Sequence, residues 1–329
     1  MSVSKLVSLR AAVRRFAFNG MQYASGAALP IGADALVFGS EMIRQGIGDI
    51  HLVSHCASQQ MNLLVAAGAV KSIETGFTGL EVFGFAQGLR RKVESGQVRL
   101  EDYSNLTMPL RYLAAALGLP FMPTRVNIGS DLQYWNGQDA AALDGNEKIP
   151  LIGDPFQEGG RVGALRPLAP DLAAIHVTLA DPQGNGIMIG SEWSRWELAR
   201  AAKRVVLIAD HIVDTACMRQ FPNLVRIPSA LTDAVVCWPL SAWPQSSPGV
   251  HDVDEAQMRA MNQALGNDAD TRNFLGTFVF GWDSHADFMA LIGSARSEAL
   301  RRTETAFLLD PYRQWFLSDR QITELTQAD

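Results

Sequence analysis

Apolar residues in this chain recur with two spacings: every three or four residues in some segments, and in short runs or at every second position in others. The first spacing is typical of an amphipathic helix and the second of a strand. The first helix is predicted over residues 4–18, where an apolar stripe runs from Leu6 to Phe16 and Asn19-Gly20 ends the pattern. Strands are predicted at 21–25, 50–54, 70–75, 121–126, 172–179, 204–209 and 232–238. Further helices are predicted at 34–45, 62–67, 83–95, 106–117 and 192–202.

This alternation of strands and helices is typical of βαβ units on a parallel sheet. We therefore expect an α/β fold, with an open, mostly parallel sheet and helices on both faces. Residues 135–170 interrupt the alternation with a stretch rich in Gly, Pro and Asp, an irregular insertion that we expect to serve function or an interface. The pattern becomes mainly helical and charged from about residue 253. No linker or repeat divides the chain, so residues 1–329 are expected to form a single domain.

Composition narrows the class of protein. The chain has 329 residues, of which 47% are hydrophobic and 19% charged, a balance that favours a large folded core over disorder. Its net charge of −6, without long Lys or Arg runs, argues against nucleic acid and anionic membranes as partners. Cys56, Cys217 and Cys237 are odd in number and widely spaced, unlike a disulfide framework or a metal clip. Without a secretory signal pattern or a long apolar span, we expect a cytoplasmic protein with no metal or bound cofactor.

Small residues follow several of the predicted strands, where open α/β sheets bind their ligands. Small side chains let a ligand approach the backbone, and free N–H groups there can stabilise an oxyanion. We predict that these loops bind substrate through Gly26, Ala27, Ala28, Ser54, His55, Gly76, Phe77, Gly129 and Ser130. The polar run at Ser58, Gln59 and Gln60 favours a substrate with a polar or charged tail, although solvation of the loop explains it equally well.

Other catalytic signatures are missing from the sequence. No GxGxxG follows the first strand, and P-loop, HExxH and GxSxG patterns are absent. His176 lies within an apolar strand and is interpreted as a core histidine. His55 and Cys56 are neighbours in an extended segment, so their side chains point in opposite directions and no nucleophile–base dyad is expected. Trp193 and Trp196 are predicted to share one helix face that serves the core or a subunit contact.

The segment 100–104 (Leu-Glu-Asp-Tyr-Ser) leads into an Ala/Leu-rich helix and then residues 118–123 (Gly-Leu-Pro-Phe-Met-Pro). This arrangement resembles the family I coenzyme A-transferases, specifically the alpha subunit of the glutaconate CoA-transferase type. The strand-end loops match the family in order, and 154–156 and 181–186 resemble further family landmarks. At Ala27 the chain departs from the double glycine of the family's first loop. The matching segments run from about residue 5 to residue 240.

The resemblance implies a ping-pong exchange of CoA between an acyl-CoA and a small carboxylic acid. A glutamate on a homologous beta subunit would form the glutamyl-CoA intermediate, because the family's nucleophile motif is not found in this chain. The chain would then act in an α2β2 assembly, with CoA as substrate and Asn105 near the acyl group. Glu101 is the candidate catalytic residue of this chain, and the structural alternative is that it caps the following helix.

Two other functions stay open from the sequence. Some relatives that the chain resembles are CoA-ester ring hydrolases of steroid degradation, which rely on an acid from the alpha chain. The amide at Asn105 argues against this activity, although Glu101 or Asp102 could supply the acid. The third possibility is a non-catalytic acyl-CoA-binding or scaffold protein, because no triad, metal cluster or redox motif can be found in the sequence.

Overall fold

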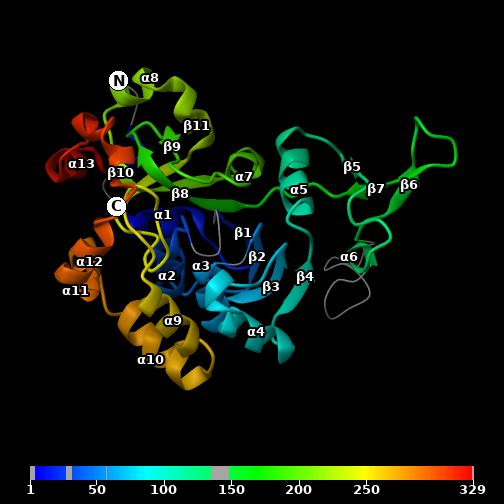
Figure 1. The fold of residues 1–329 in the computed structure, drawn as a ribbon, viewed down its shortest axis with the longest axis horizontal. Coiled ribbons are helices and arrows are strands. Elements are labelled where there is room, and N and C mark those ends of the chain that lie inside the picture. Colours follow the sequence, from blue (N-terminus) through cyan, green and yellow to red (C-terminus); the bar gives the residue numbers. More distant parts are fainter. Residues whose placement is uncertain (1–3, 27–31, 57, 135–147, 328–329) are drawn as a thin grey trace.

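A central sheet organises the computed structural model, which describes residues 4–26, 32–56, 58–134 and 148–327. Its strand order is β11-β9-β8-β1-β2-β3-β4, with β10 paired to β8 and β12 paired to β10 (Figure 1). All pairs are parallel except β8–β9 and β9–β11. The strands are β1 (Gln22–Ser25), β2 (Ile50–Ser54), β3 (Val70–Thr75), β4 (Arg99–Asp102), β8 (Leu172–Ala180), β9 (Gly186–Ile187), β10 (Val205–Ile212), β11 (Val225–Ile227) and β12 (Ala234–Cys237). The predicted open, mostly parallel sheet is confirmed.

Helices cover both faces of this sheet, as predicted (Figure 1). One face packs against α1 (Leu9–Phe16), α2 (Leu36–Arg44), α3 (Gln59–Ala66) and α4 (Gln87–Glu94). The other packs against α5 (Thr107–Ala116) and α7 (Arg195–Ala201). All nine residues of β8 are buried, which is why this strand is a continuous apolar run in the sequence rather than an alternating one.

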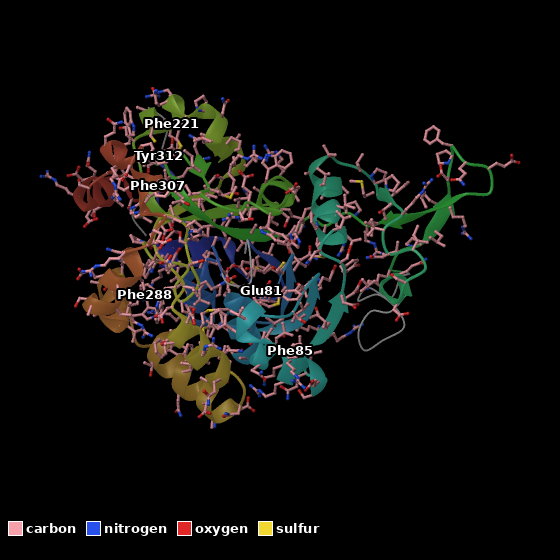
Figure 2. The ribbon with its side chains drawn as sticks, in the orientation of Figure 1. Glu81, Phe85, Phe221, Phe288, Phe307 and Tyr312 are labelled. Atoms are coloured by element: carbon pink, nitrogen blue, oxygen red, sulfur yellow. The ribbon has the colours of Figure 1, made fainter. Side chains whose placement is uncertain are left out.

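The C-terminal region is mainly helical, as predicted. Helices α9 and α10 pack on α2 and α3 through a separate apolar cluster. Further along, the chain returns to α8, where the rings of Phe221 and Tyr312 meet with centroids 5.1 Å apart (Figure 2). The helices are α8 (Thr215–Gln220), α9 (Glu255–Ala264), α10 (Asp268–Phe278), α11 (His285–Ile292), α12 (Ser294–Arg301) and α13 (Asp319–Leu325). Short 3-10 turns are η1 (Glu81–Phe83), η2 (Pro222–Leu224), η3 (Ser229–Leu231), η4 (Ala306–Leu309) and η5 (Arg313–Trp315). Among the described residues, no helix has the length and apolar character needed to cross a membrane.

A second, antiparallel sheet projects from the body of the molecule (Figure 1). It pairs β7 (Arg161–Leu165) with β5 (Met122–Thr124) on one side and with β6 (Leu151–Gly153) on the other. The short helix α6 (Asp131–Tyr134) follows β5. The prediction of a main-sheet strand at 121–126 is wrong in its placement, because β5 pairs only with β7 among the described strands. Residues 135–147 of the expected insertion lie outside the described residues.

Two local expectations also fail. Residues 4–8 are not helical, because Leu6 pairs with Val235 beside the sheet and α1 begins after Ser8, whose hydroxyl accepts the Ala11 N–H at 3.0 Å. Trp193 precedes α7 with a φ of 43°. The two tryptophans therefore do not share a helix face.

Candidate functional site

The loops after β1, β2, β3 and β4 form the first candidate region, which we call the strand-end region. Gly26 begins the loop after β1, and a Cβ there would lie only 2.8 Å from a carbonyl oxygen of β8. A larger residue would therefore force the backbone to move. The Gly76 N–H donates to the His55 carbonyl at 3.1 Å, which joins the loops after β3 and β2. The predicted residues Ala27 and Ala28 lie outside the described residues.

His55 is buried where β2 ends. Its Nδ1 lies 2.9 Å from the Ser194 hydroxyl, and its ring meets the Trp193 ring edge-on, with centroids 4.9 Å apart. Burial lowers the pKa of His55 to about 4, against the opposing effect of a hydrogen bond with the Asn105 backbone. The imidazole is therefore neutral at pH 7, so that one ring nitrogen is a donor and the other an acceptor. His55 can orient a loop or a ligand here, but it supplies no positive charge.

The neighbouring Cys56 carries a protonated thiol. Burial raises the pKa of Cys56 to about 12, with the charge of Glu81 as a second cause. Its Sγ lies 3.9 Å from the Oδ1 of Asn105, whereas Nδ1 of His55 lies beside the Ser194 hydroxyl. That His55 and Cys56 form no catalytic dyad stays a prediction. The buried Ser54 hydroxyl donates to the Cys56 carbonyl at 2.6 Å, so Ser54 stabilises the loop.

Exposed groups surround these buried ones. Phe77 is 37% exposed, and Asn105 is exposed beside Gly76, where a Cβ would lie 2.9 Å from its Oδ1. Glu81 is also exposed and has a φ of 53°, a conformation that is uncommon for residues other than glycine. The strand-end region thus combines close backbone packing, neutral polar groups and the Glu81 carboxylate.

Other predicted site residues lie elsewhere. The Gly129 N–H donates to Oε1 of Gln133 at 2.7 Å and the Ser130 hydroxyl to the Asn127 carbonyl at 2.7 Å. Both follow β5 in the projecting sheet, so their expected place at the carboxyl edge of the main sheet is wrong. Ser58, Gln59 and Gln60 are buried. Gln60 accepts a hydrogen bond from the Tyr23 hydroxyl at 2.7 Å, so this polar run is neither solvated nor open to a substrate.

A polar cleft forms the second candidate region, on the sheet face that α5 partly covers. We call it the sheet-face cleft, and its volume is about 690 Å³. It lies over the start of β2, along β3 and β4, and beside α5. Its lining residues are Gly20, Gln22, Asp49, His51, Lys71, Ser72, Glu74, Arg99, Glu101, Tyr103, Arg111, Lys148 and 166–169.

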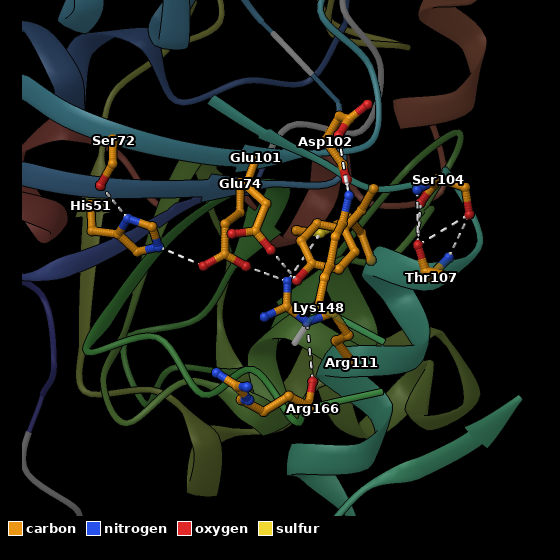
Figure 3. Close-up of polar contacts among 12 residues, drawn as sticks. His51, Ser72, Glu74, Glu101, Asp102, Ser104, Thr107, Arg111, Lys148 and Arg166 are labelled. Atoms are coloured by element: carbon orange, nitrogen blue, oxygen red, sulfur yellow. Dashed lines mark hydrogen bonds and ion pairs between the residues drawn. The ribbon is translucent and has the colours of Figure 1, made fainter. Parts of the chain in front are cut away.

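Glu74 of β3 lies at the centre of this cleft's hydrogen-bond network (Figure 3). Its carboxylate pairs with Nη1 of Arg111 and lies 2.7 Å from Nε2 of His51, whose Nδ1 lies 2.6 Å from the Ser72 hydroxyl. Burial opposes ionisation of Glu74, but Arg111 and His51 outweigh it and hold its pKa at about 2. Glu74 is therefore a buried anion at pH 7, ion-paired with Arg111 of α5 and hydrogen-bonded to His51 of β2.

Glu101 lies within β4, six residues before Thr107, the first residue of α5. The interpretation of Glu101 as a helix cap is therefore wrong. Its side chain is 2% exposed and accepts a hydrogen bond from the Tyr103 hydroxyl at 2.6 Å. Arg111 and Lys148 lie over the Tyr103 ring, 4.2 and 4.8 Å from its centroid. Glu101 belongs to the sheet-face cleft rather than to the loop edge of the sheet.

His51, Glu74, Arg111 and Lys148 are site residues that the sequence patterns did not predict. A signal was present: Ser72 and Glu74 on β3, and Arg99 and Glu101 on β4, are polar at alternate positions, so each pair lies on one face of its strand. Polar residues on the same face of neighbouring strands indicate a polar cleft or a buried network.

Buried polar groups also occur in the core. The predicted core histidine, His176, is confirmed: it is 1% exposed, and its Nε2 lies 2.8 Å from Oδ2 of Asp210. Three or more His, Cys, Asp or Glu side chains placed to hold a metal ion are not found together in the described ranges.

Curated proteins similar to this chain include CoA-transferase subunits. The A subunit of glutaconate CoA-transferase from Acidaminococcus fermentans is 28% identical over 89% of this chain and 93% of that protein. The A subunit of 3-oxoadipate CoA-transferase from Pseudomonas knackmussii is 27% identical over 89% of this chain and 100% of that protein. The cholesterol ring-cleaving hydrolase IpdA subunit of Mycobacterium tuberculosis is 25% identical over 78% and 87%. An uncharacterized protein of Archaeoglobus fulgidus is 32% identical over 91% of this chain, which spans 65% of that protein's length.

The fold agrees with these similarities. The crystal structure of glutaconate coenzyme A-transferase from Acidaminococcus fermentans superposes with a TM-score of 0.85 at 25% identity, covering 97% of this chain and 100% of that one. The sequence pattern of the family described as "Coenzyme A transferase" matches residues 7–237, from just before α1 to the end of β12. The chain belongs to the coenzyme A transferase family, in which it resembles the alpha subunits.

Proposed function

We propose that this chain is the alpha-type component of a heteromeric, cytoplasmic CoA-transferase. It would work with a homologous beta chain in an α2β2 assembly and move CoA between an acyl-CoA and a small carboxylic acid. The support is the similarity to the A subunits of two transferases, which extends over 89% of this chain and nearly all of theirs.

The protonation states in the strand-end region support placing the nucleophile on the beta chain. The Cys56 thiol has a pKa of about 12, the Ser54 hydroxyl is bound to backbone, and the neighbouring His55 is neutral at pH 7. A protonated thiol and an unactivated hydroxyl are weak nucleophiles. We therefore assign the nucleophilic glutamate to the beta chain, and the loops and acyl pocket to this one.

In the proposed reaction, the partner's glutamate carboxylate attacks the thioester carbonyl, and the C–S bond breaks to release CoA thiolate and leave a mixed anhydride. The thiolate then attacks the glutamyl carbonyl, which releases the first acid and forms a glutamyl-CoA thioester. The incoming carboxylate reverses both steps. Backbone N–H groups of the strand-end region would stabilise the oxyanions, and exposed Phe77 and Asn105 would contact the acyl group.

Glu101 enters this proposal as a positioning residue. Its hydrogen bond with Tyr103 lies on the segment that leads from β4 to Asn105. Glu101 therefore fixes the path of the loop on which Asn105 meets the strand-end region, without touching the reacting atoms.

Reconstitution with the beta chain tests the proposal. We expect CoA exchange between an acyl-CoA and free acids only when both chains are present. Borohydride reduction of the thioester intermediate, followed by mass spectrometry, should locate the modified glutamate on the partner. Glu81 is an exposed carboxylate in the strand-end region and so is the rival candidate for the nucleophile. Glu81→Gln should retain exchange, because we assign the nucleophile to the beta chain. A modified Glu81, or substantial exchange by this chain alone, would contradict the assignment.

A second candidate is the ring-cleaving hydrolase, supported by the similarity to the IpdA protein. The two activities differ in their need for an acceptor. A transferase releases no net CoA without an acceptor acid, whereas a hydrolase consumes a cyclic β-diketone CoA ester in water alone. The beta sequence also separates them, because a retained nucleophilic glutamate favours the transferase. Tight CoA binding by this chain, with no turnover by the complex, would favour the non-catalytic binding function.

A further inference from the structure

We propose that the sheet-face cleft binds a phosphorylated small molecule at a site separate from the strand-end region. The cleft's volume of about 690 Å³ lies within the range of small-molecule sites, roughly 300–1,000 Å³. Five cationic residues line it, namely Lys71, Arg99, Arg111, Lys148 and Arg166, against the three carboxylates of Asp49, Glu74 and Glu101. The chain as a whole carries a net charge of −6. The cleft is thus a locally positive surface on an acidic protein, which favours an anionic ligand.

A β-bulge directs one of these cations into the cleft. Ile50 of β2 pairs with Val70 of β3, but the next residue, His51, pairs with Ser72. Lys71 is therefore the extra residue of β3, and it lines the cleft on the same side as Ser72. Bulges commonly redirect a side chain beside a functional site. Lys71 is exposed and makes no ion pair or hydrogen bond through its side chain with a described residue, so its ammonium group is available to a ligand.

The buried cations of the cleft are held in place. Arg111 donates from Nη1 to Glu74 and from Nε to the Arg166 carbonyl at 3.1 Å. Its Nη2 has no hydrogen-bond partner within the described part of the chain. The Lys148 side chain is only 1% exposed, and its Nζ lies 3.1 Å from Oδ1 of Asp102. Cations that are fixed before the ligand arrives lower the entropy cost of binding it.

Phosphate fits this arrangement better than a single carboxylate does. A phosphate monoester carries close to two charges at pH 7 and three acceptor oxygens, which can meet a guanidinium and an ammonium together. The ligand could be the nucleotide end of CoA or a separate nucleotide. The first source depends on the proposed transferase function, whereas phosphate binding itself does not.

Calorimetric titration of the assembled complex, with no acyl-CoA present, tests the inference. The probes are adenosine 3′,5′-bisphosphate, ADP and inorganic phosphate. We expect saturable binding that Lys71→Glu weakens about tenfold or more. Arg272→Glu is the matched control, because Arg272 is exposed on α10 and lies outside the cleft, so the same charge change should alter the affinity less than about twofold. Lys71→Ala, together with thermal unfolding of each variant, shows whether weaker binding results from a folding defect.

Competition identifies the source of the phosphate. Dependence on the 3′-phosphate, together with displacement by CoA, assigns the cleft to the nucleotide end of CoA. Binding of ADP that saturating CoA does not displace assigns it to a separate nucleotide. Both results support a phosphate site in the cleft. Absence of saturable binding by all three probes, or equal weakening by Lys71→Glu and Arg272→Glu, would overturn the inference. None of these results depends on transferase turnover.

Discussion

Replacing Glu74 with Gln removes a buried charge on which the cleft network depends. The residue is 7% exposed, and Arg111 and His51 overcome burial to lower its pKa from 4.5 to about 2. That difference of about 2.5 pH units corresponds to about 3 kcal/mol at 1.36 kcal/mol per unit. Independently, a buried Arg111 left without its counter-ion is expected to cost about 3–5 kcal/mol. We therefore expect Glu74→Gln to lower the free energy of unfolding by about 3 kcal/mol at pH 7.

The pH dependence follows from the direction of the pKa change. Folded Glu74 stays ionised down to about pH 2, whereas in the unfolded chain it takes up a proton near pH 4.5. Its contribution to stability is complete above the unfolded pKa and is lost as the pH falls through the folded pKa. Urea unfolding followed by tryptophan fluorescence should show the gap between wild type and Glu74→Gln shrinking to less than half by about pH 3.

Glu94→Gln is the matched control for this experiment. Glu94 pairs with Arg90 one helical turn away, and its side chain is 62% exposed. An exposed pair of this kind contributes about 0.5 kcal/mol or less, so this variant should differ little from wild type at any pH. A Glu74→Gln gap below about 1 kcal/mol, or one that is constant from neutral to acidic pH, would refute the reasoning.

Two further substitutions and one chemical modification test the two regions. Glu101→Gln should leave folding intact and lower turnover of the complex less than about tenfold, whereas a loss of about 100-fold would show that Glu101 acts directly in the chemistry. Cys56 should resist alkylation at about pH 8 in the folded protein, because burial raises its pKa to about 12, and rapid modification found by peptide mass spectrometry would contradict this. Gly76→Ala places a Cβ 2.9 Å from Oδ1 of Asn105; we expect reduced exchange activity with normal binding to the beta chain, and unchanged kinetics would show that the loops tolerate the shift.

The regular part of the fold could be predicted because local patterns specify it. The sequence predicts β2 and β3 with the bounds that the structure has, at Ile50–Ser54 and Val70–Thr75. Both are short, β-branched and followed by small residues, and both lie on a sheet covered by helices. β-branched residues in a short run that ends at turn residues give a strong strand signal, even where polar side chains occur within the run, so such strands are easy to locate.

Local sequence patterns do not specify which other strand a short strand pairs with. Residues 121–126 have the composition of a strand, but their composition does not indicate which strand they pair with. In the structure, Met122 pairs with Leu165, more than 40 residues later in the sequence. This long-range pairing moves Gly129 and Ser130 away from the strand-end region, although their loop has the same small-residue composition as the others.

Glu101 and the sheet-face cleft show a second limit of prediction from the sequence. The charged segment Arg99–Asp102 resembles a loop edge in the sequence, because charge is more common in loops than in buried strands. Its strand conformation depends on parallel pairing with β3, where Glu74 is opposite Glu101. Two adjacent carboxylates there require cations, which Arg111 of α5 and Lys148 supply from outside the two strands. Such compensation becomes visible only in three dimensions.

The two candidate regions lie on the same strands. On β3, Glu74 of the cleft network is two residues from Gly76 of the strand-end region, and on the β4 side Glu101 is four residues from Asn105. Stability alone does not explain the charges, because apolar residues of similar volume often stabilise a buried site as well as an ion pair does. The buried carboxylates are explained if their role is to hold cations beside an open cleft. An anion that binds Arg111 and Lys71 would contact the guanidinium that pairs with Glu74 of β3 and a residue of β3 itself. Its binding would therefore act on the strand that leads to Gly76. Any change that this binding makes in acyl-CoA affinity must equal the change that acyl-CoA makes in phosphate affinity, since coupling between two binding equilibria is reciprocal.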